Sequence, residues 1–350
     1  LVLIHAGPGA EGGGANIWSH RGSINQPLQP DSTSITGYIM NPEENVGGGI
    51  SPIGVFCHEY GHSLGLPDFY DVAYNPGSQG LGRWALMASG NYNGNSQLPA
   101  HMCTFSKWSL GFFAAQQPST NLAQAEIPPL ATDTIAYALI PGGGAIDQQY
   151  WIVENRQPYG FDAGLPGFGL LIYHVDLTRP NQTDPSNYRI AVEQADGLNQ
   201  MALSGSRGDA ADPFPGTTDN RYFHTFTTPD SRYYDGTVSE VGVWDISNSD
   251  SLMYADLDVV YSRPRIVLTG NDSLTFTDTL GSGDGDGFLE PGETIEFNVH
   301  IQNIMRPAQN AVVHMSSDVS GLTFVENDKA LTALLQPIFK PKLAEPIVFT

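Results

Sequence analysis

The chain has 350 residues, which is more than one ordinary hydrophobic core requires, so we expect two or three domains. Its 37 acidic and 15 basic side chains give a net charge of −22, and so acidic a chain would repel phosphate backbones and anionic lipids. These features argue against a nucleic-acid partner, and no run approaches the about 18 apolar residues of a membrane span.

Glycine (39) and proline (25) are frequent, as is typical of a loop-rich, β-rich globular protein. Many aspartates adjoin glycine or asparagine, in segments such as GSGDGDG. Such loops suit Ca²⁺, which is abundant outside cells, although an acidic surface that serves solubility explains the charge equally well. Cys57 and Cys103 could form a disulfide or be two small buried residues, and we favour the second interpretation.

The first 50 residues contain two predicted strands and two glycine-rich loops. The opening segment LVLIHAG predicts a buried strand, in which His5 is a hydrogen-bonded core residue rather than a ligand. TSITGYIMNPE predicts an edge strand. Because a buried strand stands at the very start, we expect the first domain to be incomplete at its N-terminus.

A helix is predicted to start at Ser51, a favoured N-cap residue, with Pro52 in the first helical position. Gly65 ends the helix and Pro67 follows it. The apolar residues of this segment recur at helical spacing and form its predicted buried face: Ile53, Phe56, Cys57, Tyr60 and Leu64.

The same helix carries a candidate zinc site. His58 and His62 are four residues apart, so their side chains share one face and both imidazoles can reach one ion. Glu59 is offset by about 100°, beside the ion, where a general base can take a proton from zinc-activated water. Gly65 lets the chain turn back, and this brings Asp68 within reach as a third ligand.

A core helix that happens to contain histidines is the alternative interpretation of HExxH. The helix start, the apolar face and the extension of the motif to HExxHxxGxxD together favour zinc catalysis. Asp71 is expected to fix the turn or to bind a second cation rather than to ligate zinc.

Downstream, the segment PAHMCTFSKWSLGFF predicts a second helix. Beyond Pro118, short β-rich runs separated by turn residues predict a β-sandwich, and His174 in one of them is expected to be a core residue. From about Arg263 a further series of strands predicts an immunoglobulin-like module whose end is missing. We therefore predict a multi-domain α+β protein in which residues 1–120 form the domain of the candidate zinc site, 121–260 a β-sandwich domain and 261–350 an immunoglobulin-like β domain.

The segment HEYGHSLGLPDFYD, followed by GRWALMASGNYNG, resembles the immune inhibitor A-like secreted zinc metallopeptidases, a branch of the metzincins. LVLIHAGPGAEGGGANIWSH resembles the strand and loop ahead of the family's zinc helix. YWIVENRQPYGFDAGLPGFGLLIYHVD and the segment from VEQADG to GDAADPFPG resemble the β-rich region after it, so the resemblance spans residues 1 to 258.

This resemblance implies a metzincin-like domain in which His58, His62 and Asp68 bind zinc and Glu59 is the general base. It also implies that Met87 forms a hydrophobic floor beneath the metal in a tight turn, a role that differs little from that of an ordinary core methionine. Many metzincins have a tyrosine two residues after this methionine, but Ser89 stands there, and Tyr92 is a weak substitute. A complete domain of this family would have a helix and strands ahead of LVLIHAG, so we expect this domain to be partial at its N-terminus.

Two aspartate clusters are candidate calcium sites. The segment GDAADPFPG offers Asp209 and Asp212, with Asp219 nearby, and plain turn chemistry is the alternative. GSGDGDGFLEPGE offers Asp284 and Asp286, with Glu293 nearby, but the spacing departs from that of an EF-hand and a β-hairpin turn is the alternative.

The sequence thus predicts a secreted or cell-surface zinc endopeptidase that acts on protein or peptide substrates, such as host or extracellular matrix proteins. Zn²⁺ is the expected cofactor, with Ca²⁺ as a second candidate. A surface adhesion or glycan-binding protein that retains an idle protease scaffold is the first alternative, and the intact histidines, Glu59 and Asp68 argue against it. A metal-dependent hydrolase of non-peptide substrates is the second.

Overall fold

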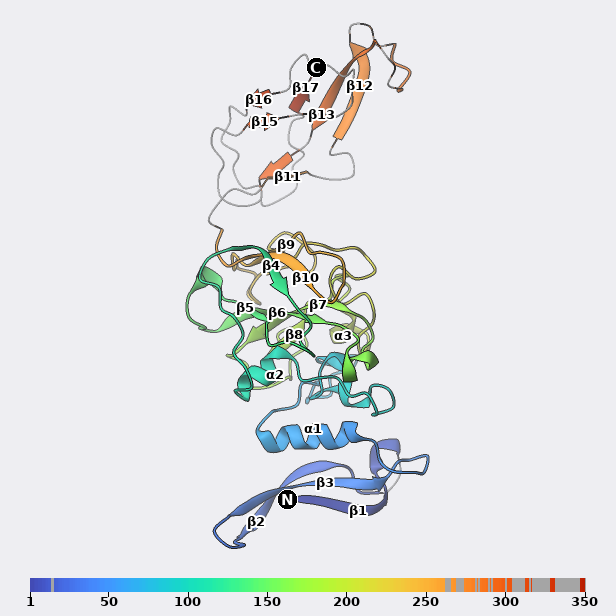
Figure 1. Ribbon diagram of the computed structural model, residues 1–350, viewed down its shortest axis with the longest axis vertical. Helices are drawn as coiled ribbons and strands as arrows, with labels where there is room; N and C mark the ends of the chain where they lie inside the picture. The colour runs from blue at the N-terminus through green and yellow to red at the C-terminus, as the bar shows by residue number, and fades with distance from the viewer. Residues whose placement is uncertain are drawn as a thin grey trace. The chain divides into compact units, whose positions relative to one another are not determined.

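The structure, a computed structural model, describes residues 1–13 and 16–261 and shorter segments beyond them (Figure 1). These segments are 266–268, 274–280, 282, 284–288, 290, 292–299, 301–303, 312–314, 316, 328–330 and 347–349. The chain forms two compact units, residues 1–260 and 261–350, which are described separately below.

The first unit opens with a three-stranded sheet in the order β1 (Val2–Pro8), β3 (Ile35–Glu44) and β2 (His20–Leu28). β1 runs parallel to β3, whereas β2 is antiparallel to it. The prediction of an edge strand in TSITGYIMNPE is wrong, because β3 lies between the other two strands. The prediction of a buried first strand is wrong, because Val2 and Ile4 are 52% and 51% exposed. β1 lies at the edge of the sheet and alternates between exposed and half-buried side chains, and His5 is half-buried rather than a core residue.

The predicted zinc-motif helix is α1 (Ile53–Leu64). It begins one residue later than predicted, with Pro52 rather than Ser51 at the N-cap and no side-chain cap. The reason lies in a tertiary contact, since the Gly54 N–H donates to the carbonyl of Ser96 at 2.9 Å. A main-chain acceptor from a distant segment thus replaces the expected serine cap.

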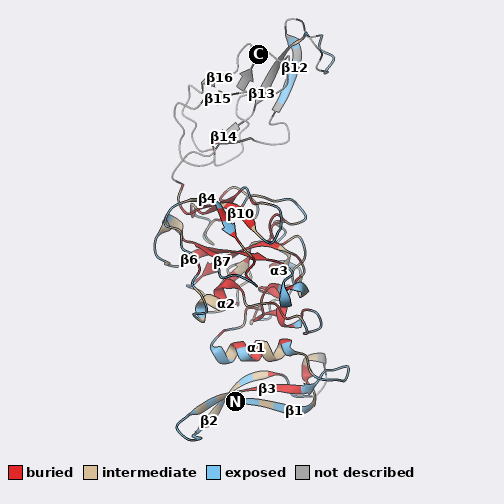
Figure 2. Cartoon of the chain, in the orientation of Figure 1, coloured by how far each residue is buried: buried red, intermediate tan, exposed pale blue. Residues whose placement is uncertain are grey.

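The predicted buried face of α1 is also wrong. Its buried residues are Gly54, His58, Glu59 and Gly61, while the apolar side chains at three of the predicted core positions are exposed: Ile53, Tyr60 and Leu64. The small glycines let other segments approach this side of the helix closely, so His58 and Glu59 are buried on it (Figure 2).

Gly54 marks the closest of these approaches. A Cβ atom at this position would lie 1.9 Å from the carbonyl oxygen of Asn91. Gly54→Ala should gain about 1 kcal/mol of helix propensity, but this overlap with main chain should cost more, for a net loss of about 2 kcal/mol in the free energy of unfolding. Urea unfolding measures the loss, with Ser63→Ala on the exposed side of α1 as a control expected within about 0.5 kcal/mol of wild type. Equal stability of Gly54→Ala and wild type would show that α1 does not pack this closely.

The second predicted helix is shorter than expected. α2 covers only Thr104–Ser109, because the Glu154 carboxylate accepts the Thr104 N–H at 2.6 Å at its start and Gly111, with φ +73°, follows its C-cap. No described helix is long and apolar enough to cross a membrane.

Two sheets follow, as the β-rich sequence predicts. The central one has the order β5 (Tyr137–Leu139), β6 (Gln149–Arg156), β7 (Gly169–Asp176) and β8 (Ile190–Val192), and all its neighbouring strands are antiparallel. The other has the order β4 (Leu122–Ile127), β10 (Met253–Asp258) and β9 (Gly242–Trp244). The unit also contains these short helices: η1 (Ala10–Gly12), η2 (Gly82–Trp84), η3 (Ser89–Tyr92), η4 (Pro141–Gly143), η5 (Gly160–Gly164) and α3 (Gln200–Leu203).

The central sheet is buried on both faces, and every residue of β7 is buried (Figure 2). One face packs against Phe69, Trp84 and Phe105 in a first core, and the other packs against the β4–β10–β9 sheet in a second core. The first core joins residues on both sides of position 120. The predicted boundary there lies within one core, and the division into a peptidase domain and a β-rich domain stays a prediction.

The second unit is described only as paired antiparallel strands, so the immunoglobulin-like fold stays a prediction that falls largely outside the described residues. The pairs are β11 with β14, β12 with β13, β13 with β17 and β15 with β16. Their bounds are β11 (Ile266–Leu268), β12 (Leu274–Leu280), β13 (Thr294–Val299), β14 (Ile301–Asn303), β15 (Val312–His314), β16 (Asp328–Ala330) and β17 (Ile347–Phe349).

Candidate metal centre

Two imidazoles and one carboxylate converge at the C-terminal half of α1. His58 Nε2 and His62 Nε2 each lie 3.2 Å from Asp68 Oδ1. The three ligand atoms all lie within 4.8 Å of one another. The predicted trio is therefore brought together, and its binding of a metal ion stays a prediction.

Hydrogen bonds at the far side of each ring set the tautomer of both histidines. His58 Nδ1 lies 2.9 Å from the Leu86 carbonyl and His62 Nδ1 lies 2.8 Å from the Leu66 carbonyl. Because a carbonyl only accepts, each Nδ1 carries the hydrogen, and each neutral ring has its lone pair on Nε2. Two lone pairs thus point at Asp68 Oδ1, a buried oxygen that has no hydrogen-bond partner.

This arrangement fits a bound cation. Three lone-pair atoms without a hydrogen between them repel one another unless a positive charge lies at their centre. Tetrahedral ligands at the about 2.0–2.1 Å of zinc lie about 3.3 Å apart, close to the two 3.2 Å separations observed here. Two neutral nitrogens and one carboxylate oxygen also form a zinc-type ligand set with room for a fourth ligand.

The pKa values of the two carboxylates at the centre, Asp68 and Glu59, are shifted in opposite directions. Burial alone would raise the pKa of Asp68, but the two imidazoles beside it outweigh burial and hold that pKa well below its usual range. Asp68 is therefore an anion. Burial raises the pKa of Glu59, and the two histidines only partly oppose this rise. Glu59 is the carboxylate better suited to accept a proton.

Gly65 positions Asp68 through the end of the helix. It has φ +105° and closes a Schellman motif, in which the Leu66 N–H donates to the Gly61 carbonyl and the Gly65 N–H donates to the His62 carbonyl, both at 3.1 Å. The turn also directs the Leu66 carbonyl toward the His62 ring. The predicted turn at Gly65 is confirmed.

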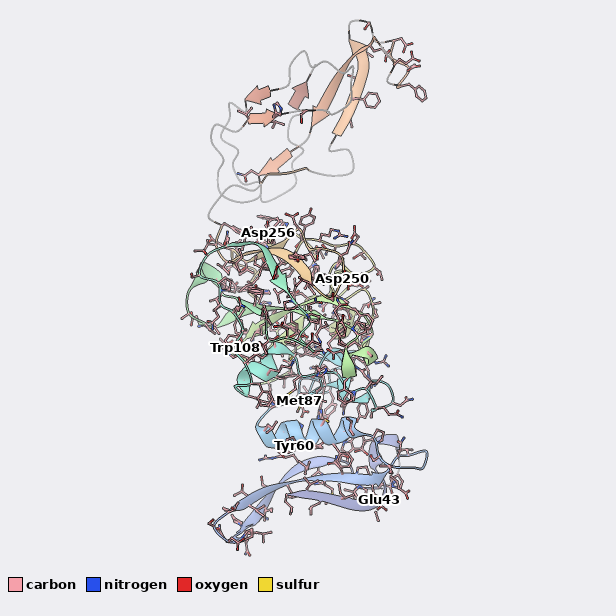
Figure 3. All side chains as sticks on the ribbon, in the orientation of Figure 1. Glu43, Tyr60, Met87, Trp108, Asp250 and Asp256 are labelled. Carbon is pink, nitrogen blue, oxygen red and sulfur yellow. The ribbon has the colours of Figure 1, made fainter. Side chains whose placement is uncertain are left out.

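Met87 is fully buried and packs directly against the backbone of α1 (Figure 3). A Cβ at Gly61 would lie 2.4 Å from Met87 Sδ, so only a glycine between the two histidines allows this contact. The main chain at this point also supports the centre, since the Met87 carbonyl accepts the Phe69 N–H at 2.7 Å and the preceding Leu86 carbonyl accepts from His58. Met87 thus lies where a floor of the metal site would be.

A cleft of about 1000 Å³ opens over the centre, and His58, Glu59, His62 and Asp68 line it. Sequence reasoning missed several other lining residues. Glu11, Trp18, His20 and Arg207 come from segments far from the motif in sequence, which no local motif could reveal, whereas Tyr70 and Tyr74 follow Asp68 closely. The weak candidate Tyr92 also lines the cleft, as does Ser89.

Asp71 fixes the turn, as one of the two predicted roles requires. Its carboxylate accepts from the Ala73 N–H at 2.9 Å, from Asn75 Nδ2 at 3.0 Å and from the Tyr188 hydroxyl at 3.2 Å. Burial opposes ionisation, but these hydrogen bonds lower the pKa of Asp71.

The carboxylates of the first aspartate cluster accept hydrogen bonds from other groups of the protein. Asp212 Oδ2 accepts from Trp84 Nε1 at 3.0 Å and from the Asp209 N–H at 2.9 Å, and Asp209 Oδ1 accepts from the Ala211 N–H. Asp219 pairs with Arg221 at 2.6 Å. Within the described part of the chain these aspartates do not belong to a three-ligand cluster, and calcium binding by Asp209 and Asp212 stays an untested prediction.

The second cluster differs in membership from the prediction. Asp284 lies together with Glu290 and Glu293, whereas Asp286 is not part of this group and accepts the Phe288 N–H at 2.8 Å. Glu293 accepts the N–H groups of Asp284 and Glu290, so this arrangement also serves the turn. Calcium binding here stays a prediction.

Two histidines outside the candidate centre lie within hydrogen-bond distance of neighbouring side chains. His174 is buried, as predicted, with its Nε2 2.8 Å from Gln149 Oε1 and its ring stacked between Trp151 and Tyr234. His20, to which the sequence assigned no role, lies in the cleft with its Nε2 3.2 Å from the Tyr38 hydroxyl.

Residues 1–119 match the family described as the immune inhibitor A peptidase M6 catalytic domain. The resemblance predicted from the zinc motif is confirmed. The match ends at residue 119, so the resemblance of residues 120–258 to the same family stays a prediction.

Two bacterial relatives show the same resemblance. Immune inhibitor A of Bacillus thuringiensis subsp. alesti is 34% identical over 111 residues, 27% of this chain and 15% of the relative. The pre-pro-metalloprotease PrtV of Vibrio cholerae serotype O1 is 33% identical over 123 residues, 32% of this chain and 13% of the relative. The aligned part of the chain thus spans less than a sixth of these relatives.

Proposed function

We propose that this chain carries the active site of a secreted, zinc-dependent endopeptidase that hydrolyses protein substrates. The observation that carries the proposal is the convergence of the His58 and His62 lone pairs on the unpartnered Oδ1 of Asp68, with Glu59 beside them in one cleft. The family match of residues 1–119 and the metalloprotease among the relatives support it.

His58, His62 and Asp68 would hold the zinc ion. When bound, zinc supplies Lewis-acid chemistry, which polarises the scissile carbonyl and lowers the pKa of a water molecule toward about 7. Glu59 takes the proton of the attacking water and later gives it to the departing amine. The raised pKa of Glu59, which burial causes, makes its carboxylate a stronger base and so suits the first of these transfers.

The substrate is proposed to be an extended peptide. β2 is an edge strand of its sheet, and it begins at His20 where Trp18, Ser19 and Arg21 line the cleft. Main-chain groups at such an edge can pair with an extended segment, which would lie across the metal centre. Extracellular proteins, including those of a host, are substrates consistent with this mode and with secretion.

Removal of the metal tests the proposal. We expect the protein to cleave a denatured protein substrate, to lose at least about 99% of this activity with a zinc chelator, and to regain it when zinc is added back. A serine-protease inhibitor is the control and should have no effect. Full activity in the chelator would contradict the proposal.

Two further readouts separate the alternative functions. A protein that contains no zinc by elemental analysis and cleaves nothing would fit an idle scaffold on an adhesion or glycan-binding protein. Turnover of small esters without turnover of proteins would indicate a hydrolase of another class.

A further inference from the structure

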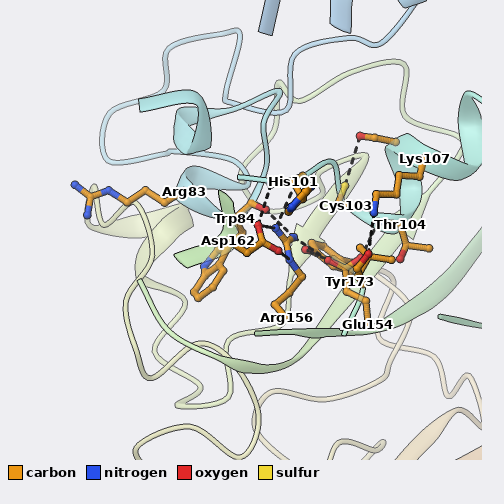
Figure 4. Close-up of polar contacts among 12 residues, drawn as sticks. Arg83, Trp84, His101, Cys103, Thr104, Lys107, Glu154, Arg156, Asp162 and Tyr173 are labelled. Carbon is orange, nitrogen blue, oxygen red and sulfur yellow. Dashed lines mark hydrogen bonds and ion pairs between the residues drawn. The ribbon is translucent and has the colours of Figure 1, made fainter. Parts of the chain in front are cut away.

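A fully buried arginine at the end of β6 connects the β-rich part of the chain to the metal centre (Figure 4). Arg156 donates Nε and Nη2 to the two oxygens of Asp162 at 2.8 and 2.7 Å, and Nη1 to Glu154 Oε1 at 3.0 Å. Its two other N–H groups donate to main-chain carbonyls, of Trp84 at 3.1 Å and of His101 at 3.3 Å. All five donors of the guanidinium are therefore used.

Trp84 lies close in sequence to the main-chain groups that contact the proposed metal ligands. Two residues further on, the Leu86 carbonyl accepts from His58 Nδ1, and the next residue, Met87, packs beneath α1. The Met87 carbonyl then accepts the N–H of Phe69, the neighbour of the third ligand. A shift of residues 84–87 would therefore move the acceptor that orients His58.

The side chain of Trp84 also forms a hydrogen bond with a residue of the β-rich part of the chain. Trp84 is fully buried, and its indole Nε1 donates to Asp212 Oδ2 at 3.0 Å. The preceding residue is fixed too, since the Arg83 N–H donates to the Arg207 carbonyl at 2.7 Å. Every one of these partners lies beyond residue 120.

We propose that Arg156 and Asp212 are positioning residues of the metal centre, which hold Trp84 and through it the Leu86 carbonyl that orients His58. The inference rests on the proposed function only in taking His58 as a metal ligand. On this proposal, residues 121–260 contribute to the geometry of the metal centre and do not form an independent domain. A ligand that is already oriented by a fixed acceptor binds its metal more tightly, because its side chain loses less conformational entropy when the metal binds.

The first test is Arg156→Lys in the full chain. Lysine keeps the positive charge beside Glu154 and Asp162, but its three donors lack the planar fork needed to reach Trp84 as well. We expect zinc affinity, measured by competition with a chromogenic chelator, to fall roughly tenfold. The visible absorption spectrum of the cobalt-substituted protein should also change, because the geometry at His58 changes.

The second test keeps the proposal falsifiable if Arg156→Lys fails to fold. Trp84→Phe removes the hydrogen bond to Asp212 and keeps most of the ring. Its matched control is Trp151→Phe, because Trp151 is equally buried, lies in the second core and has an indole N–H without a partner. Both variants should lose some thermal stability, but only Trp84→Phe should weaken zinc binding and alter the cobalt spectrum.

The outcomes separate this inference from the proposed function. Wild-type zinc affinity and an unchanged cobalt spectrum in folded Trp84→Phe, or an equal effect in Trp151→Phe, would overturn the positioning role even if the protein is an active peptidase. A protein that binds zinc, responds as expected to these substitutions and cleaves no peptide would support the positioning role and overturn the peptidase.

Discussion

Glu59→Gln is expected to abolish peptide hydrolysis and to leave the metal bound. Glutamine has the same size as glutamate, so it fits this buried position, but its amide cannot take a proton from the attacking water. General-base catalysis is worth about 10²- to 10⁴-fold, and we expect kcat to fall within or beyond that range. Peptide turnover and zinc content, measured on the same preparation, check both parts of the expectation.

Glu11→Gln provides the matched control. Glu11 lines the same cleft, and its Oε1 accepts the Ser19 N–H at 2.8 Å, a bond that the amide oxygen of glutamine can replace. We expect this variant to keep activity within about tenfold of wild type, because the group takes no part in proton transfer. Glu59→Gln with more than a tenth of wild-type turnover would mean that another group is the base.

Asp68→Asn is expected to weaken zinc binding by more than about 100-fold. The substitution removes the only negative charge among the three proposed ligands and leaves a neutral amide oxygen, which is a poorer zinc ligand. Removal of a supporting residue outside the ligand set already lowers metal affinity by about 10- to 100-fold, so loss of a ligand should have a larger effect. Chelator competition measures the affinity, and activity should fall with it at limiting zinc.

Asp71→Asn is the same substitution three residues later, with the opposite expectation. An amide at this position presents a donor to groups that themselves donate, so we expect a loss of about 1–3 kcal/mol in the free energy of unfolding. Zinc affinity should stay close to wild type. If Asp71→Asn lost zinc as severely as Asp68→Asn, the assignment of the third ligand would be wrong.

The convergence of the three candidate ligands could be predicted from sequence because its geometry is local. His58 and His62 share a helix face through their spacing, and Gly65 reverses the chain within three residues of Asp68. Helix periodicity and the need for a left-handed residue suffice for these inferences. The acceptors of the Nδ1 hydrogens are not all local, since Leu86 lies 28 residues beyond His58.

The parts that sequence could not predict depend on tertiary packing. The apolar residues of α1 indicated the wrong buried face, because the helix packs through Gly54 and Gly61, and an absent side chain leaves no hydrophobic pattern. The start of α2 depends on the Glu154 carboxylate from a distant strand. The shared first core across residue 120 arises in the same way, from contacts between segments whose sequences look separate.

The two imidazoles of the centre are oriented by main-chain carbonyls, those of Leu66 and Leu86, rather than by side chains. A carbonyl neither titrates nor changes when its residue is substituted. Relatives can therefore vary at these two positions without losing the acceptors. Low pH does not protonate these carbonyls, whereas it would protonate a carboxylate in the same role. Evolutionary constraint should instead fall on residues that shape the backbone there, so the conserved support of this site should be sought in glycines and buried packing residues.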